Sequence, residues 1–528
     1  MSENTSQPDP RLKLYLAGGL VVLFFLAAAA ATRPGITWDE PTYVGAGYGY
    51  VSWFVRLSAR SFDAEGIDSY WRPNAEHPPA AKLVYGLAGA LEGGRTLPGL
   101  MTARFFAAAL FVLLAGLVYV LAARAGGRPA GAFAALALVL MPRVFGHGHL
   151  AALDLPVALA CLATTLAFAG AEKSVWRAVG AGELWGVALL TKVNAVFLPV
   201  VLIPWALWAH RKRGLRPCAL LLLVGGLTFF AGWPWLWHRT GERVGAYIGN
   251  KVERLGDGDG ATGTTQVPVH YLGTTYRDRS APWHYPFVLT LATVPLGLLV
   301  FAGLGCRCAR PREAHGRLVI LILASGLLHL VVVALPKVPK YDGVRLFLPA
   351  FPFIACLAGL GAARVWAWRG RLGEVLVAAV LVLNGAALVH STPYELSYYN
   401  CLVGGARGAR ALGFETTYWG DTVNRDVIAF VNQACPDGSS LVVWPPYQAY
   451  FDHFPGVRDG IRYWRKWRPG QEEPDFVVLF PRQGYLGEFA RSLAGSGPPA
   501  RQWTYLGVPQ CLVYDLRNRS PGRVSSPR

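Results

Sequence analysis

The sequence predicts an α-helical polytopic membrane protein with about eleven transmembrane helices and a small C-terminal α/β domain. Of its 528 residues, 53% are hydrophobic and only 16% are charged, whereas soluble domains carry about 25% charged residues. The charged residues are also concentrated between repeated apolar runs instead of within them. Both observations are typical of a chain whose surroundings are mostly lipid.

The first apolar run, 14–32, follows a basic N-terminus and resembles a signal peptide, but many further runs follow it. We therefore interpret it as a retained first membrane helix behind a cytoplasmic segment, 1–13. Several of the runs are shorter than the ~20 residues of a straight span, and we expect these to be tilted or completed by flanking residues. The predicted spans are 14–32, 101–123, 130–142, 150–171, 179–190, 194–209, 218–235, 284–304, 317–335, 344–366 and 371–391.

The short basic loops set the predicted orientation. With eleven spans, the five loops rich in Lys and Arg all fall on the same side as Arg11 and Lys13, and cytoplasmic loops are the ones that accumulate these residues. Membrane topology therefore explains the net charge of +18, and we expect no nucleic-acid partner. The long loops 33–100 and 236–283, together with everything after 391, fall on the outer side. Within the first loop, 79–91 is apolar but too short to span, which fits a helix lying in the membrane interface.

The tail has a different pattern from the rest of the chain. The runs 441–446, 475–480 and 511–516 are typical of buried strands, and 425–435 is typical of an amphipathic helix. We predict an extracytoplasmic α/β domain over 392–516 and a disordered end over 517–528. Cys435 and Cys511 would both lie in an oxidising compartment, which leaves a disulfide between them open.

Acidic side chains on the outer side are the first candidates for chemistry. Asp39 and Glu40 directly follow the first span, where they fit equally well as the cap of a helix with Pro41 in its first turn. Glu76 and His77 stand in an E-H-P-P element, which fits equally well as a solvated loop.

Asp154 lies within an apolar run, where a charge is costly and indicates function. His147 and His149 precede it and flank a glycine, a pair that could bind a metal, although we favour the reading without one.

Basic side chains are expected at the same membrane face. Lys192 sits between two apolar runs, where snorkelling to the interface also explains it. The segment 336–353 places a basic group on the outer side, where topology alone predicts none, and phosphate binding is a natural role for such a group. The candidates are Lys82, Lys192, Lys340 and Arg345, with Tyr341 in the same segment as the last two.

These elements in combination resemble the GT-C superfamily of membrane glycosyltransferases. The resemblance rests on the acid pair after the first span, the E-H-P-P element, the D-x-P at 154–156 and the K-x-x-K-Y…R…P-x-x-P segment at 337–352. It covers about 33–366 and is closest to the protein O-mannosyltransferase and lipid A aminoarabinose transferase branch, which is glycosyltransferase family 39-like. It implies a GT-C-like catalytic domain over 14–391 in a bacterial inner or plasma membrane, with the active site and the C-terminal domain on the extracytoplasmic side.

The resemblance also implies roles for the candidate acids. Asp39 matches the acid assigned as the catalytic base, and Glu40 completes the catalytic pair. Glu76 and Asp154 would orient the acceptor or the sugar, or hold a divalent metal cation, and the metal requirement stays open. His77 stands where the aminoarabinose branch commonly has Lys, so any sugar contact inferred there is in doubt.

The roles implied for the basic candidates concern the lipid donor. Lys340 and Arg345 match positions that face the lipid phosphate, with Tyr341 beside them in the substrate-binding segment. Lys192 is a weaker candidate for the same part.

The sequence therefore predicts a glycosyltransferase that moves a monosaccharide from a polyprenyl-phosphate donor to a lipid, glycan or protein acceptor, with inversion. A polytopic transporter or lipid flippase is the alternative, but transporters place their ionisable groups near the bilayer midplane, often in paired repeats. Here the charges lie mainly at the outer ends of spans, and no clear repeat relates the halves. A non-catalytic scaffold would explain the tail but not these charges. Besides donor and acceptor, the expected partners are membrane lipids.

Overall fold

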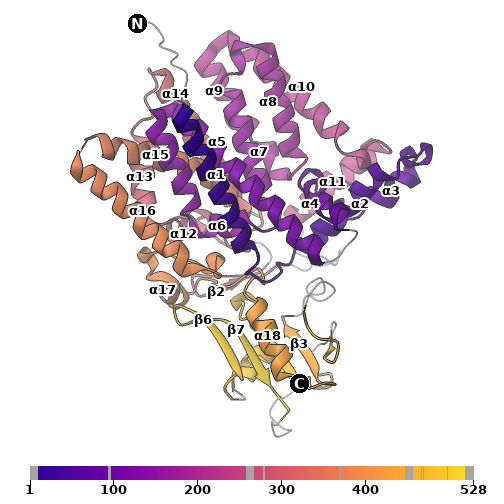
Figure 1. Cartoon of the computed structure of the whole chain (residues 1–528). Helices are drawn as coiled ribbons and strands as arrows, with labels where there is room; N and C mark the ends of the chain where they lie inside the picture. Colours follow the sequence, from indigo (N-terminus) through magenta and orange to yellow (C-terminus); the bar gives the residue numbers. More distant parts are fainter. Residues whose placement is uncertain are drawn as a thin grey trace.

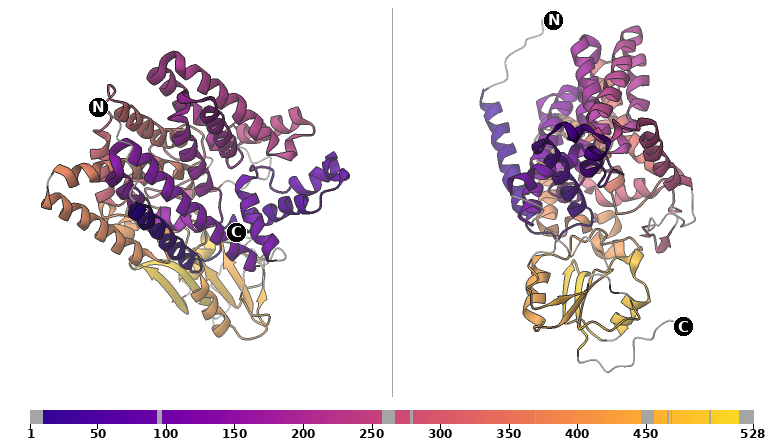
Figure 2. Two further views of the ribbon diagram at one scale, coloured as in Figure 1. Left: turned by 45° about the horizontal axis from the view of Figure 1, so that its top comes forward. Right: turned by 90° about the vertical axis from the view of Figure 1, so that its right-hand side faces the viewer.

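The computed structural model describes residues 10–92, 97–256, 267–277, 280–368, 370–445, 456–464, 467, 469–495 and 497–517. Helices make up the larger part of the molecule, and a mixed sheet formed by the tail lies against one end of them (Figure 1). Figure 2 shows the same division from two further directions, with the strands gathered below the helices.

The helical part runs from the N-terminus to residue 391. Its first half contains α1 (Pro10–Ala31), α2 (Glu40–Val55), α3 (Ala64–Trp71), α4 (Ala80–Leu91), α5 (Leu97–Val139), α6 (Pro142–Gly148), α7 (Asp154–Phe168), α8 (Val175–Leu189), α9 (Pro199–His210), α10 (Leu215–Ala231) and α11 (Thr240–Gly256). Its second half contains α12 (Tyr285–Thr293), α13 (Leu296–Cys306), α14 (Ala314–Ala334), α15 (Phe351–Trp368) and α16 (Arg371–Ser391). A two-stranded hairpin, β1 (Val269–Tyr271) and β2 (Thr274–Tyr276), lies between the halves.

Small residues let the central helix α15 approach its neighbours closely. A Cβ atom on Gly361 would lie 1.8 Å from the carbonyl oxygen of Phe301 on α13, and one on Gly359 would lie 2.3 Å from that of Ala130 on α5. Glycine at such contacts is typical of helices packed within membranes, where close packing replaces the hydrophobic effect as the driving force. The largest apolar cluster of the molecule surrounds this contact.

The predicted eleven spans are not confirmed. In the described part of the chain, five stretches are long and apolar enough to cross a membrane, or six if the bent pair α12 and α13 forms one span. Two of these stretches, 99–139 and 193–231, each join two predicted spans through a break that the sequence analysis treats as a loop. One break lies at Gly127, whose φ is 86°, and the other is a 3₁₀ turn over Arg211–Gly214. The helices at 18–31, 80–91 and 154–168 are apolar but shorter.

The tail contains a five-stranded sheet in the order β4-β3-β5-β7-β6. The strands are β3 (Ser440–Trp444), β4 (Arg462–Tyr463), β5 (Phe476–Leu479), β6 (Arg501–Tyr505) and β7 (Val508–Asp515). β3, β4 and β5 are parallel, whereas β7 runs antiparallel to β5 and β6. The three strands expected from sequence correspond to β3, β5 and β7.

Helices cover both faces of this sheet. Because side chains alternate along a strand, Leu441 and Val443 pack under α18 (Arg425–Ala434), while Val442 faces α20 (Glu488–Gly495). α18 starts at Asn424, whose side chain accepts hydrogen bonds from two backbone N–H groups of its first turn. A further short helix, α17 (Gly405–Ala411), precedes them. Cys435 and Cys511 both lie buried in the core beneath α18, and the structure has them as free thiols.

Two buried carboxyls at the junction of the tail and the helices predict a stability that falls with pH. Burial raises the pKa of Glu395 to about 7, and burial together with the charge of Glu395 raises that of Asp421 to about 7. An acid whose pKa is higher in the folded than in the unfolded state contributes its full stabilisation to the folded state below its unfolded pKa, about 4. This contribution is lost as the pH rises through the folded pKa, about 7. We expect a loss of about 1.4 kcal/mol per pH unit per group over that window.

Thermal unfolding between pH 4.5 and 8 tests this prediction. Asp421→Asn should flatten the dependence, whereas Asp426→Asn, an exposed carboxyl on the nearby α18, should leave it unchanged. An equal slope in wild type and Asp421→Asn would contradict the prediction.

Candidate active site

A cluster of buried charges lies where the α1–α2 loop, the start of α7, the segment before α15 and the tail meet. Asp39 is the N-cap residue of α2, and Asp154 is the first residue of α7. Carboxylates at helix N-termini are stabilised by the partial positive charge there. Arg345 opens the 3₁₀ turn Arg345–Ala350 that leads into α15, and Lys192 follows the end of α8. These four predicted residues therefore come from four separate elements.

Arg345 is the centre of the cluster. Its Nη2 lies 2.5 Å from Asp39 Oδ2, its Nε lies 3.0 Å from Asp154 Oδ2, and its Nη1 lies 2.6 Å from Asp342 Oδ2. The second oxygen of Asp154 accepts a hydrogen bond from Lys192 Nζ at 2.5 Å. A guanidinium has donors in a fixed fork, which suits it to hold several carboxylates at defined angles.

Four further members, Asp342, Glu415, Trp419 and Arg482, were not predicted, and the last three come from the tail. The indole Nε1 of Trp419 donates to Asp39 Oδ2 at 3.1 Å, and its ring lies 3.9 Å from Arg345 Cζ. Arg482 Nη2 lies 2.8 Å from Asp342 Oδ1, an ion pair without hydrogen-bond geometry. Arg482 also donates to Glu415 Oε1 at 3.2 Å.

The accessibility of the carboxylates separates Asp39 from the others. Its side chain is 29% exposed, against 1% for Asp154, 5% for Asp342 and 6% for Glu415. A substrate can therefore reach Asp39, whereas the other three acids are covered by protein.

The electrostatics of the cluster act on Asp39 in both directions. Partial burial of its carboxyl raises its pKa above the ordinary value, while Arg345 opposes the rise. The neighbouring charges of Asp342 and Asp154 raise the pKa further, and the hydrogen bond from Trp419 opposes them. An acid with a raised pKa is a stronger base once it is ionised, which suits it to accept a proton.

Glu40 lies outside this cluster although it is adjacent to Asp39 in sequence. Both of its oxygens accept from Arg104 on α5, at 2.8 and 2.7 Å, and they also accept from the backbone N–H groups of Thr37 and Ala151. These contacts outweigh the effect of burial and lower the pKa of Glu40. Because its carboxylate is fully bonded within the fold, we give Glu40 no part in the proton transfer proposed below.

The E-H-P-P element does not join the cluster directly, because Tyr43 lies between them. The ring of His77 packs edge-on against Tyr43, with centroids 5.8 Å apart, and Tyr43 lies one turn after Asp39 in α2. Glu76 Oε1 lies 3.9 Å from His77 Nε2, and both side chains are half-buried. Lys82 is buried and donates to the carbonyl of His77 at 2.6 Å and to that of Asn74 at 2.9 Å, so it stabilises this loop.

Lys340, like Lys82, is bonded to backbone carbonyls, whereas Arg345 and Lys192 are bonded to carboxylates. Its Nζ donates to the carbonyls of Leu335 at 3.1 Å and Val338 at 3.2 Å, and the side chain is buried. An ammonium has three donors, and among the residues that the structure describes these two bonds leave one N–H for a ligand. Burial lowers the pKa of Lys340. Tyr341 follows it and is half-buried.

Within the described residues, no group of three or more His, Cys, Asp or Glu side chains is arranged to hold a metal ion. The rings of His147 and His149 pack against Trp419 and Phe145, with centroids 5.2 and 5.4 Å apart. The carboxylates of Asp39 and Asp154 are bonded to Arg345. The side chains here do not fit the divalent cation that the sequence left open.

An apolar groove of about 580 Å³ lies among α4, α5, α7 and α8. Two of its lining residues are close in the chain to members of the cluster: Pro156 is two residues after Asp154, and Thr191 directly precedes Lys192. Its other lining residues come from α4 (Ala80, Ala81, Val84), α5 (Leu110, Leu113, Leu117, Arg124), α7 (Leu159, Ala160, Ala163, Leu166, Ala167) and α8 (Leu184, Val187). The backbone N–H of Ala80 donates to the carbonyl of Leu190 at 2.8 Å, which joins α4 to the end of α8.

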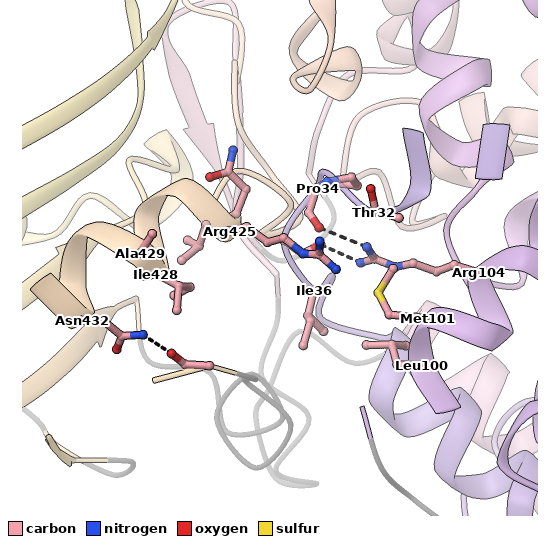
Figure 3. A pocket seen from close by; sticks show the side chains of 14 residues that line it. Thr32, Pro34, Ile36, Leu100, Met101, Arg104, Arg425, Ile428, Ala429 and Asn432 are labelled. Atoms are coloured by element: carbon pink, nitrogen blue, oxygen red, sulfur yellow. Dashed lines mark hydrogen bonds between the residues drawn. The ribbon is translucent and has the colours of Figure 1, made fainter. Parts of the chain in front are cut away.

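A second cavity, of about 500 Å³, lies between α18 and the α1–α2 loop (Figure 3). Ile428, Ala429 and Asn432 line it on the side of α18, and Ile36 and Leu100 line it on the side of the helices. Asp39 is not among its lining residues, so this cavity is separate from the charged cluster.

Sequence patterns could have indicated some of the residues that were missed. Arg104 lies within the predicted span 101–123, and a charge in such a run indicates a partner. Asp342 stands three residues before Arg345. Nothing in the sequence pairs Trp419 or Arg482 with Asp39, because that proximity depends on how the tail packs against the helices.

Comparisons with known proteins address both the sequence and the fold. The family model described as dolichyl-phosphate-mannose-protein mannosyltransferase matches residues 76–238. ArnT from Cupriavidus metallidurans bound to undecaprenyl phosphate has a similar structure, with a TM-score of 0.54 at 18% identity over 98% of this chain and 99% of that one. Its apo state gives a TM-score of 0.52 at 17% identity with the same coverage. No curated protein matches the sequence.

Proposed function

We propose that this chain, whose family match and fold confirm its resemblance to the GT-C superfamily in the ArnT and protein O-mannosyltransferase branch, is an inverting glycosyltransferase. It would transfer a monosaccharide from a polyprenyl-phosphate donor to a lipid, glycan or protein acceptor at the outer face of a bacterial inner or plasma membrane. The observation that carries the proposal is Asp39, a partly exposed carboxylate held by a cation in a cluster of buried charges. An apolar groove whose lining includes chain neighbours of Asp154 and Lys192 supports it.

The groove fits the lipid part of such a donor. Its lining is apolar apart from Arg124 and Thr191, and it runs along helices that belong to the predicted membrane part. A prenyl chain lying in it would bring its phosphate towards the end lined by Thr191, next to Lys192. Apolar area and a few polar groups at one end are the usual composition of a lipid site.

Asp39 would act as the general base. The acceptor hydroxyl would lose its proton to Asp39 while its oxygen attacks the anomeric carbon of the sugar. The bond between that carbon and the phosphate oxygen breaks, and its electron pair leaves with the polyprenyl phosphate. This direct displacement needs one carboxylate and inverts the anomeric centre, whereas a retaining scheme needs a second carboxylate as nucleophile. No step is assigned to a metal ion.

The cations would stabilise the charge that develops on the leaving phosphate. Lys340 has an N–H left for a ligand, and Arg345 and Lys192 already face anions. Donors fixed in a buried site stabilise developing charge more than water does, because they need no reorganisation. Glu76 and His77 lie beyond Tyr43, where they would contact the sugar or the acceptor.

The test is transfer by the purified protein in detergent, with a panel of polyprenyl-phosphate sugars and with lipid, glycan and protein acceptors. Release of polyprenyl phosphate with formation of a product of inverted anomeric configuration is the expected result. A product of retained configuration would contradict the direct displacement. Failure to turn over any donor, together with movement of the lipid across vesicles, would favour the transporter instead.

Blocking the groove should weaken the binding of long-chain donors selectively. Ala163, on α7, lines the groove, and a Trp there would overlap the prenyl chain. Because overpacking costs about 1–3 kcal/mol, we expect KM for a long-chain donor to rise about tenfold or more, with little change for a donor too short to fill the groove. Ala378→Trp, on the exposed face of α16, is the matched control. Equal effects on long and short donors would contradict this assignment of the groove.

A further inference from the structure

We propose that the tail completes the active site: Trp419 positions Asp39 and Arg345, and Arg482 positions Asp342. The inference rests on the proposed function, because it assigns these side chains a part in the same transfer reaction. It makes the tail more than a cover or an acceptor-binding domain.

Trp419 holds both members of the central ion pair. Its Nε1 donates to Asp39 Oδ2, the same oxygen that Arg345 Nη2 approaches, and its ring lies flat enough against Arg345 for Cζ to be 3.9 Å from the ring centroid. The N–H fixes the direction of the carboxylate, and the ring restricts the guanidinium from one side. Trp419 is itself fully buried.

The backbone around Trp419 is joined to the loop that carries Asp39. The N–H of Trp38 donates to the carbonyl of Trp419 at 3.2 Å, and the N–H of Gly35 donates to that of Asp421 at 2.6 Å. A Cβ atom on Gly35 would lie 2.2 Å from the carbonyl oxygen of Val423, so the two segments are in close contact. His147 packs on the ring of Trp419. The indole therefore has little freedom to move away from Asp39.

Arg482 forms the second link between the tail and the cluster. Asp342 lies between two arginines, with Oδ2 bonded to Arg345 and Oδ1 paired with Arg482. Arg482 is in turn fixed by a hydrogen bond of 2.7 Å to the carbonyl of Tyr418 and lies 5.0 Å from the ring centroid of Trp38. Asp342 is thereby held in place to orient Arg345, the residue that faces Asp39.

These contacts indicate that the tail positions the charged side chains and does not merely cover the site. A covering segment would need shape and apolar surface, whereas the tail places an N–H on Asp39 and a cation on Asp342, both within the charged cluster. Loss of a hydrogen bond to a charged group weakens binding about ten- to a hundredfold. Loss of the N–H also removes an interaction that lowers the pKa of Asp39.

The test compares Trp419→Phe, which keeps a ring on Arg345 and removes the N–H, with the wild type. We expect kcat to fall about ten- to a hundredfold with the donor KM unchanged, and the acid limb of the pH–rate profile to move to higher pH. The charged groups that face Asp39, namely Arg345, Asp342 and Asp154, are retained in this variant. Trp503→Phe, on β6 of the same tail, is the matched control and should change neither quantity.

A double-mutant cycle tests the contact without any turnover. The shifts in unfolding temperature of Trp419→Phe and Asp39→Ala, which removes the acceptor oxygens, should be non-additive if the indole bonds the carboxylate. Those of Arg482→Met and Asp342→Ala should be non-additive likewise. Additive shifts in both cycles, or a Trp419→Phe enzyme with unchanged kcat and pH profile, would overturn the proposal. If the wild type turns over no donor, the proposed transferase function is wrong. The two cycles still show whether the positioning contacts exist, because they measure unfolding and need no turnover.

Discussion

Replacing Asp39 by Asn lowers sugar transfer by about 10²–10⁴-fold, the contribution expected of a general base. The substitution keeps the size of the side chain and an oxygen for Arg345 and Trp419, so the fold should survive. It removes the group that takes the proton of the acceptor. We expect the donor KM to change little, because Asp39 acts on the acceptor hydroxyl and not on the lipid.

The measurement is polyprenyl phosphate release by wild type and variant under single-turnover conditions. Asp63→Asn is the matched control: Asp63 is an exposed carboxyl between α2 and α3, within the same predicted loop 33–100, and its loss should leave the rate unchanged. Equal rates for wild type and Asp39→Asn would remove Asp39 as the base. Glu76 would then be the next candidate, since Glu40 has both of its oxygens bonded to Arg104.

Replacing Arg104 by Met destabilises the protein by about 3–5 kcal/mol, the cost of breaking a buried ion pair from one side. Arg104 donates to both oxygens of Glu40 and to the carbonyl of Ala31 at the end of α1. It also donates to the carbonyls of Pro34 (Figure 3) and Gly35 in the loop before Asp39. Without it, the carboxylate of Glu40 is buried with no cation. The three carbonyls lose their donors as well.

Thermal or chemical unfolding in detergent measures this effect. The double variant Arg104→Met with Glu40→Gln should recover part of the loss, because the glutamine brings no charge and its single oxygen still accepts from one of the two N–H groups of Thr37 and Ala151. Arg312→Met, at an exposed position, should shift stability by no more than about 0.5 kcal/mol. Equal stability of Arg104→Met and wild type would contradict a structural role for this pair.

The sequence predicted the class of the protein because lipid-facing runs leave a strong signal in composition. The strands β3, β5 and β7 were predictable for a similar reason, since buried strands are continuous apolar runs bounded by turns. The number of spans was not, because the break at Gly127 and the bend between α12 and α13 change how a run of apolar residues is divided. The break at Gly127 lies in a loop that the sequence did predict, although the helices on its two sides form one continuous stretch. The bend between α12 and α13 falls inside the single predicted span 284–304.

The candidate site was predicted in part. Asp39, Asp154, Lys192 and Arg345 were singled out because each places a charge against an apolar run, and the structure brings these four together. Sequence reasoning grouped Glu40 with Asp39 because they are adjacent, but successive residues at a helix start point in different directions, and Glu40 turns towards Arg104. Trp419 contacts Asp39 across 380 residues of the chain, and Arg482 contacts Asp342 across 140, distances that local patterns do not cover.

The bonding of Arg345 has a consequence for the charge balance of a whole turnover. The sugar donor is a phosphodiester with one negative charge, and the released lipid phosphate carries a second charge above a pKa of about 6. In the proposed reaction Asp39, which faces Arg345 Nη2, becomes neutral as the phosphate gains that charge. One negative charge therefore moves from Asp39 to the leaving group, and the net charge of the site stays the same. The guanidinium of Arg345 can then pair with the doubly charged lipid phosphate in place of the neutral carboxyl of Asp39. Product release would return the proton from Asp39 to solvent, which restores the ion pair for the next donor.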